Sequence, residues 1–363
     1  MNRSNKVSYY IQGLGHISSQ KTYDNTNFLK ELMTYEDNFM PAVVPDFKQY
    51  INPVLIRRLS QSLRIGLSAA KLCTIDAMLD KPDAIITASG YGCIGDTHRF
   101  MHEIIDHGEK QLTPTFFMQS TYNALSGLIA MTMHCNNYNS TYAHRGFAFE
   151  TALQDAMMQL TDAPEKRMIV GSYDEANYEQ FTISQRSGIN RKEPVHNLSL
   201  FETTGKGTLQ GESAAFFALG THVTATTYCQ IKAVKMLYAP DSSAEIQQCI
   251  EAFLDENALS VADLDLVLNG IGGDEQDDSK SKALASDYFA AIPQGLFKHL
   301  SGDYSTASSF GVWLAAMIFR HGTVPTVVSA TDTLRHAPIK NILVFNHFWG
   351  KCYSFILLAA TGE

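Results

Sequence analysis

Apolar residues recur along this chain in two patterns, one with helical spacing and one of short unbroken runs. Helical spacing covers residues 54–79, 149–160, 246–254 and 308–319. Short apolar runs, typical of buried strands, cover residues 83–88, 167–171, 214–219, 264–268, 340–345 and 353–359. A first strand is also predicted at 7–11, with a tight turn at the glycines of 13–15. Helices and buried strands that alternate in this way predict an α/β fold.

The second half of the chain repeats the order of the first half. A helix, a strand and a glycine-rich turn follow one another between residues 54 and 92, and the same order returns between residues 246 and 273. Such a repeat predicts two similar halves that pack together as one unit. We place their boundary after residue 220, so that the halves are 1–220 and 221–363.

Charge and composition argue against several classes of protein. The net charge of −9 lacks the basic footprint of a nucleic-acid-binding protein. The six cysteines are scattered without CxxC pairs, which indicates reduced thiols and neither a disulfide framework nor a zinc site. No apolar stretch is long enough for a signal peptide or a bilayer span, so we expect a cytoplasmic protein. No motif indicates a cofactor or a metal.

Candidate chemistry concentrates in residues 113–150. A polar approach at 118–123 leads into a helix-like run, and a β-prone piece at 139–143 then turns at His144-Arg145-Gly146 into the next helix. A strand that turns sharply into a helix presents the turn residue beside free backbone N–H groups, and acyl-transfer enzymes keep a nucleophile at such a point. This turn contains neither Cys nor Ser.

Three motifs in this region resemble a known family. FxQSTYNxxSG at 117–127, TYxHRGFxFExAL at 141–153 and VGSYDE at 170–175 resemble the condensing enzymes, the β-ketoacyl-acyl-carrier-protein synthases of thiolase fold. They are most similar to the branch of chain-length factors that accompanies a separate synthase in aryl-polyene or flexirubin-type pathways. The resemblance implies a thiolase-like fold, with two similar halves in a five-layer αβαβα arrangement.

The catalytic Cys-His-His set of that family is not matched here. The family Cys falls on Ala143, or on His144 after a shift of one residue. The first family His, in a "NAHGTGT" motif, falls on Ile271, and the second, in "KSMTGHLLGAAG", falls on Asp303, whereas the Lys of that second motif is retained as Lys298. An isoleucine has no hydrogen-bond donor, and an ionised aspartate would repel an enolate.

The resemblance therefore implies a catalytically degenerate subunit that pairs with an active ketosynthase, or with itself, and meets an acyl carrier protein in fatty-acid or polyene-type polyketide synthesis. Alternatives are an atypical condensing enzyme or acyltransferase in which His144 pairs with Asp303, and a stand-alone acyl-chain-binding protein. Candidates for the acyl tunnel or the interface are Phe117, Gln119, Phe147, Phe149, His347 and Phe348. The apolar set proposed for the dimer surface is Phe116, Phe117, Met118, Leu125 and Leu128.

For three further residues we expect a particular structural role or location. Asp174, at the end of a predicted strand, is expected to be structural rather than catalytic. Glu212, at the start of the strand at 214–219, is expected to accept hydrogen bonds from the backbone of a neighbouring loop. Cys135 is expected in a surface loop.

Overall fold

The computed structural model describes residues 7–330 and 338–362. Its largest sheet has the strand order β10-β9-β11-β12-β8-β1-β7-β5-β3-β4. These strands are β1 (Tyr9–Ser18), β3 (Ala84–Ser89), β4 (Tyr138–Ala143), β5 (Met168–Asp174), β7 (Ser213–Gly220), β8 (Cys229–Tyr238), β9 (Leu266–Gly270), β10 (Gln294–Leu296), β11 (Asn341–Phe348) and β12 (Cys352–Ala359). A small second sheet pairs β2 (Phe39–Met40) with β6 (Gln210–Gly211).

The strand order contains the same five-strand pattern twice. β4, β3 and β5 are parallel neighbours, followed by antiparallel β7 and β1. β10, β9 and β11 are likewise parallel neighbours, followed by antiparallel β12 and β8. The two patterns meet where Tyr9, Tyr10 and Ile11 pair with Ile231, Gln230 and Cys229. The boundary at residue 220, in the connection from β7 to β8, remains a prediction.

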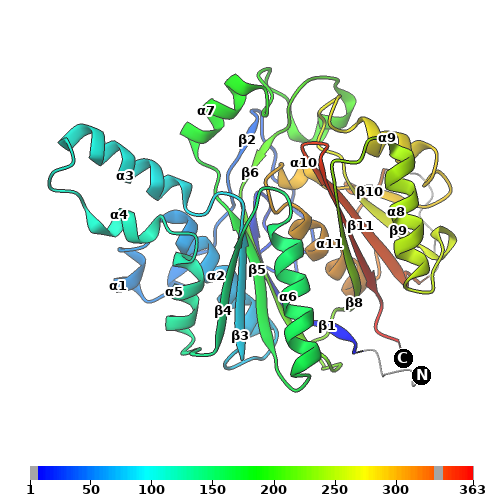
Figure 1. Ribbon diagram of the computed structural model, residues 1–363, viewed down its shortest axis with the longest axis horizontal. Helices are drawn as coiled ribbons and strands as arrows, with labels where there is room; N and C mark the ends of the chain where they lie inside the picture. The colour runs from blue at the N-terminus through cyan, green and yellow to red at the C-terminus, as the bar shows by residue number, and fades with distance from the viewer. Residues whose placement is uncertain (1–6, 331–337, 363) are drawn as a thin grey trace.

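Helices make three layers around the two five-strand units (Figure 1). The first outer layer is α2 (Gln61–Asp76) with α5 (Ala124–Thr132), and the second is α8 (Ser243–Asp255) with α9 (Ser279–Ser286). Between the units lie α6 (Ala148–Asp162) and α11 (Ser308–His321), whose apolar side chains share one core with strands of both units. This arrangement confirms the predicted five-layer αβαβα fold.

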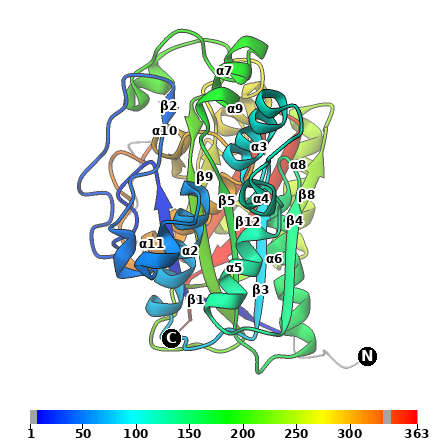
Figure 2. The ribbon, with the colours of Figure 1, turned by 90° about the vertical axis from the view of Figure 1, so that its left-hand side faces the viewer.

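The remaining helices lie around this framework. They are η1 (Phe47–Gln49), α1 (Pro53–Ile56), α3 (Ile94–His107), α4 (Pro114–Gln119), α7 (Tyr178–Ser187), η2 (Asn197–Glu202), η3 (Val261–Asp263) and α10 (Lys298–Ser301). α3 and α4 project to one side of the molecule (Figure 1), and Figure 2 shows them from that side with α5, in front of β3 and β4. No helix in the described part of the chain is long and apolar enough to cross a membrane.

The predicted turn at 13–15 is wrong, because β1 runs unbroken from Tyr9 to Ser18. Its glycines allow α2 to lie close against the strand. A Cβ atom on Gly15 would lie 2.1 Å from the carbonyl oxygen of Ala69, and one on Gly13 would lie 2.5 Å from the backbone nitrogen of Ala77. The helix predicted at 54–79 is likewise divided into α1 and α2.

The proposed dimer surface is wrong in two of its members. Leu125 and Leu128 lie inside the outer core formed by α2, α5 and their strands. Leu125 packs where Gly66 of α2 has no side chain, since a Cβ atom there would lie 2.4 Å from Leu125 Cδ2. Phe117 and Met118, on α4, are exposed by 57% and 68%. They therefore remain available for an interface.

Candidate functional site

A narrow cavity of about 40 Å³ lies where loops of both halves meet, with room for about three water molecules. The segments around it follow β3 and β5, belong to α7, precede β6, or join α10 to α11 and β11 to β12. Its lining residues are Tyr91, Ile94, Asp174, Glu175, Gln180, Ser184, Ile189, Asn190, Thr208, Gln210, Asp303, Tyr304, Ser305, Phe348 and Trp349. Among the described residues, no lysine, arginine, histidine or cysteine lines it.

Asp174 fixes the two halves against each other at one wall of the cavity. Its Oδ1 accepts hydrogen bonds from Gly90 N (2.8 Å) and Ser89 Oγ (3.2 Å). Its Oδ2 accepts from Thr306 N (2.9 Å) and Thr306 Oγ1 (2.8 Å). Burial raises the pKa of Asp174 in spite of these donors. With both oxygens occupied, Asp174 has the structural role expected of it.

Lys298 and Asp303 form a buried ion pair at the opposite wall. Lys298 Nζ lies 2.9 Å from Asp303 Oδ1, and the two side chains are only 1% and 5% exposed. The same ammonium group donates to the backbone oxygen of His347 at 2.7 Å. The retained lysine is therefore used to neutralise the aspartate and to hold the end of β11.

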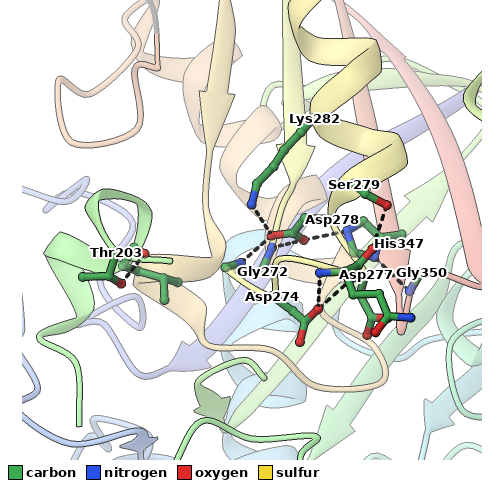
Figure 3. Close-up of polar contacts among 12 residues, drawn as sticks. Thr203, Gly272, Asp274, Asp277, Asp278, Ser279, Lys282, His347 and Gly350 are labelled. Carbon is green, nitrogen blue, oxygen red and sulfur yellow. Dashed lines mark hydrogen bonds and ion pairs between the residues drawn. The ribbon is translucent and has the colours of Figure 1, made fainter. Parts of the chain in front are cut away.

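Asp278 is the centre of a second polar cluster behind this wall (Figure 3). Its carboxylate accepts from Gly272 N (2.9 Å), Gly273 N (2.8 Å) and His347 Nε2 (3.0 Å), and Lys282 Nζ lies 3.5 Å away. Burial by itself would raise the pKa of Asp278. Its hydrogen bond with His347, together with the Gly272 N–H and Lys282, outweighs burial and holds that pKa below its ordinary value.

His347 is fixed by hydrogen bonds on both ring nitrogens. Nδ1 accepts from Gly350 N at 3.3 Å, so the ring proton belongs on Nε2, which donates to Asp278. The side chain is buried, 3% exposed, and does not line the cavity. Its role in this geometry is to position the turn that carries Phe348 and Trp349, which do line the cavity.

Asp303, one of the four positions expected at the family triad, lines the cavity. Ile271, a second such position, is buried and directly precedes Gly272. A Cβ atom on Gly272 would lie 3.5 Å from Asp303 Oδ2, which shows how close the two loops come. This region offers an aliphatic side chain and a lysine-bound carboxylate.

The other two positions lie elsewhere. Ala143 and His144 are exposed at the end of β4, beside an apolar surface depression of about 460 Å³ that Phe147 also lines. The His144 ring stacks on Phe147 with centroids 5.5 Å apart. In the described part of the chain no hydrogen bond or ion pair joins His144 to Asp303, so the geometry does not support the acid–base pair considered from the sequence.

The remaining tunnel candidates divide by their surroundings. Phe348 lines the cavity, whereas Phe149 is fully buried in the central core, 5.7 Å from the Phe217 ring. Gln119 accepts from Ser60 N at 3.1 Å and donates to Arg58 O at 2.6 Å, so it joins α4 to the segment before α2. Neither Phe149 nor Gln119 borders the cavity. Phe149 packs in the central core, and the side chain of Gln119 hydrogen-bonds to backbone atoms of Ser60 and Arg58.

Cys135 lies in the loop between α5 and β4, as expected, but its side chain is buried in the outer core and not at the surface. The expectation for Glu212 is confirmed. Glu212 accepts hydrogen bonds from Ala42 N (2.8 Å) and Ala176 N (3.4 Å). Burial raises the pKa of Glu212 to about 7. Cys93, next to the cavity residue Ile94, has its pKa raised to about 12 by burial and is therefore a poor nucleophile.

Sequence reasoning missed Asp278, Asn190 and Tyr304. Asp278 ends the mostly acidic segment 274–278, in which the residue spacing matches no known motif. Asn190 and Tyr304 lie in polar loops, and only the fold brings them to one cavity.

The fold is similar to that of several solved structures. The ishigamide ketosynthase/chain length factor matches with a TM-score of 0.82 at 16% identity, over 98% of this chain and 100% of that one. A type II polyketide acyl-carrier protein in complex with its ketosynthase matches with a TM-score of 0.78 at 14% identity, over 98% and 100%. A β-ketoacyl synthase from Burkholderia phymatum matches with a TM-score of 0.78 at 11% identity, over 98% and 100%.

No curated protein sequence matches the chain. The family model described as "Beta-ketoacyl synthase, N-terminal domain" matches residues 36–252. This match spans more than half of the 363 residues, and the chain therefore belongs to the β-ketoacyl synthase family.

Proposed function

We propose that this chain is a catalytically degenerate β-ketoacyl synthase-like subunit, a chain-length factor, that pairs with an active ketosynthase in fatty-acid or aryl-polyene-type polyketide biosynthesis. The proposal depends on two residues. They are Ile271, which is aliphatic, and Asp303, whose carboxylate forms an ion pair with Lys298. Condensation needs hydrogen-bond donors where negative charge develops on the thioester oxygen. An isoleucine offers no donor, and an ionised carboxylate accepts hydrogen bonds but donates none.

The thiols support the same proposal. A condensing enzyme holds its acyl chain on a nucleophile, and in the described part of the chain no cysteine lines the cavity. Cys93 is the cysteine nearest to it in sequence, and its raised pKa keeps it protonated. The family nucleophile position falls on Ala143 or on His144, and neither side chain can form a thioester.

The exposed edge of the sheet supports pairing with another chain. β4 pairs on one side with β3 and ends the strand order on its other side. An exposed strand edge presents unpaired backbone groups that another chain can continue. Phe117 and Met118 are apolar side chains exposed on α4, beside α5. By analogy with the ketosynthase/chain length factor and the carrier-protein complex above, we propose an active ketosynthase and an acyl carrier protein as partners.

The test is reconstitution. The chain is produced with an intact Cys-His-His synthase encoded beside it, and the complex is identified by light scattering. Condensation is then followed by mass spectrometry with carrier protein and extender unit. We expect a heterodimer, and we expect His144→Ala and Asp303→Asn to leave the rate within a few-fold. Loss of a general acid or base costs about 10²–10⁴-fold.

A rate loss of about a thousandfold for His144→Ala, with an unchanged circular dichroism spectrum, would contradict the proposal. It would identify this chain as an enzyme with a histidine mechanism. A clean monomer that does not associate with the synthase would also contradict it.

A further inference from the structure

The cavity contains a buried amide oxygen that no donor in the described chain reaches. Asn190 is 2% exposed, and its Oδ1 has no partner, whereas its Nδ2 donates to Thr208 O at 3.2 Å. Gln210 Nε2 donates to Gly211 O at 3.1 Å. Because both amide nitrogens donate to backbone carbonyls, the orientation of each amide is fixed and its oxygen remains as an acceptor. A buried acceptor without a donor is costly, so such a site favours a ligand that donates.

Three carboxyl groups line the cavity, those of Asp174, Glu175 and Asp303, and no basic side chain of the described residues does. The Lys298 ammonium pairs with Asp303 and so offsets one of the three. Glu175 accepts from Gly95 N at 3.0 Å, and burial raises its pKa. A cation bound in the cavity would favour the ionised form of such a carboxyl group.

Aromatic rings complete the lining. Tyr91, Phe348 and Trp349 belong to the cavity, and the rings of Phe348 and Trp349 stack with centroids 4.7 Å apart. The guanidinium group of the exposed Arg145 lies 4.5 Å from the centroid of the Tyr91 ring. One of these rings therefore already attracts a cation, and the rings also offer apolar surface to a short alkyl chain.

We propose that this cavity binds the ammonium group of a small primary amine. Asn190 Oδ1 accepts one of its N–H donors, the carboxylates supply the opposite charge, and the aromatic rings contact its methylene groups. Room for about three water molecules suits an ammonium group with two or three carbons and excludes a long acyl chain. The proposal concerns this chain's own cavity, so it holds with or without a partner synthase.

The experiment uses the purified full chain and three probes of similar size. They are n-propylammonium, 1-propanol and propionate, measured near neutral pH by saturation-transfer-difference NMR and by calorimetric titration. We expect propylammonium to bind at least about tenfold more tightly than propanol, and propionate not to bind, because charge-assisted hydrogen bonds are the stronger ones. Equal binding of propylammonium and propanol would overturn the proposal.

Variants locate the site. Asn190→Leu removes the free acceptor at similar volume and is expected to weaken propylammonium binding about tenfold. Asn136→Leu is the matched control, because Asn136 is exposed in the loop before β4, and it should bind as the unchanged protein does. Since Asn190 also holds Thr208 O, Glu175→Gln gives a second measurement that retains an acceptor for Gly95 N. It should weaken binding several-fold with the circular dichroism spectrum unchanged. Binding that neither Asn190→Leu nor Glu175→Gln alters would overturn the proposal.

Discussion

Glu212 makes the stability of this protein depend on pH in a way that one substitution removes. In the unfolded chain its carboxyl has the ordinary pKa of 4.5, and in the folded protein burial raises that pKa to about 7. Between these pH values the folded protein binds more protons than the unfolded chain. The free energy of unfolding therefore falls as pH rises through this window.

The size of the effect follows from the shift. Each pKa unit corresponds to about 1.36 kcal/mol, and the difference between 4.5 and about 7 gives a loss of about 3 kcal/mol by pH 8. Glu212→Gln keeps one oxygen, which can accept from Ala42 N, loses the acceptor for the longer bond from Ala176 N, and does not ionise. We expect the variant to match the unchanged protein near pH 5 and to be more stable by about 3 kcal/mol near pH 8.

The assay is urea denaturation at several pH values between 5 and 8, followed by circular dichroism. Other buried carboxyls titrate as well, so the informative quantity is the difference between the two proteins at each pH. The control is Glu251→Gln, because Glu251 is exposed on α8. A Glu212→Gln variant that is less stable than the unchanged protein at pH 8 would refute the reasoning, because it would mean that the ionised carboxylate stabilises the fold.

Three further predictions follow from the site. Asp278→Ala leaves Gly272 N and Gly273 N without their buried acceptor, at about 1–3 kcal/mol each, and hydrogen exchange should show both amides losing protection while strands of the first half keep theirs. A cysteine-directed inhibitor of ketosynthases should form no stoichiometric adduct at neutral pH, because burial raises the pKa of Cys93 to about 12; a single selective adduct by mass spectrometry would contradict this. Phe117→Asp on α4 should weaken association with a partner chain by at least about tenfold, and unchanged association by light scattering would exclude α4 from the interface.

The sequence was sufficient for most of the fold because its strands and helices have distinct apolar patterns. Central strands such as β5 and β9 are buried on both faces, so they are written as unbroken apolar runs. The patterns failed where a residue serves a close contact with a distant element. Gly13 and Gly15 look like a turn in the sequence, but they are small because α2 lies against β1. Few side chains of α3 and α7 are buried, and neither helix was predicted.

The site was less predictable than the fold. The motifs predict that Ile271 and Asp303 stand where the family has two imidazoles, and the structure places Asp303 at the cavity. The buried pair of Asp278 and His347 could not be predicted, because its members are separated by 69 positions and neither belongs to a recognisable spacing. Phe149 was assigned to the tunnel as a bulky residue after a turn, which stays a prediction, and its side chain lies in the central core.

The central helix layer bears on how a chain with two similar halves could have evolved. α6 contacts its own strands and also β8, and α11 contacts its own strands and also β1 and β7. A single five-strand unit standing alone would leave the far side of its central helix in water, with apolar side chains exposed. Such a unit could be stable only when a second copy covered that side. If the halves arose by duplication of one gene, self-association of the ancestral unit therefore came first, and fusion of two copies made the contact permanent.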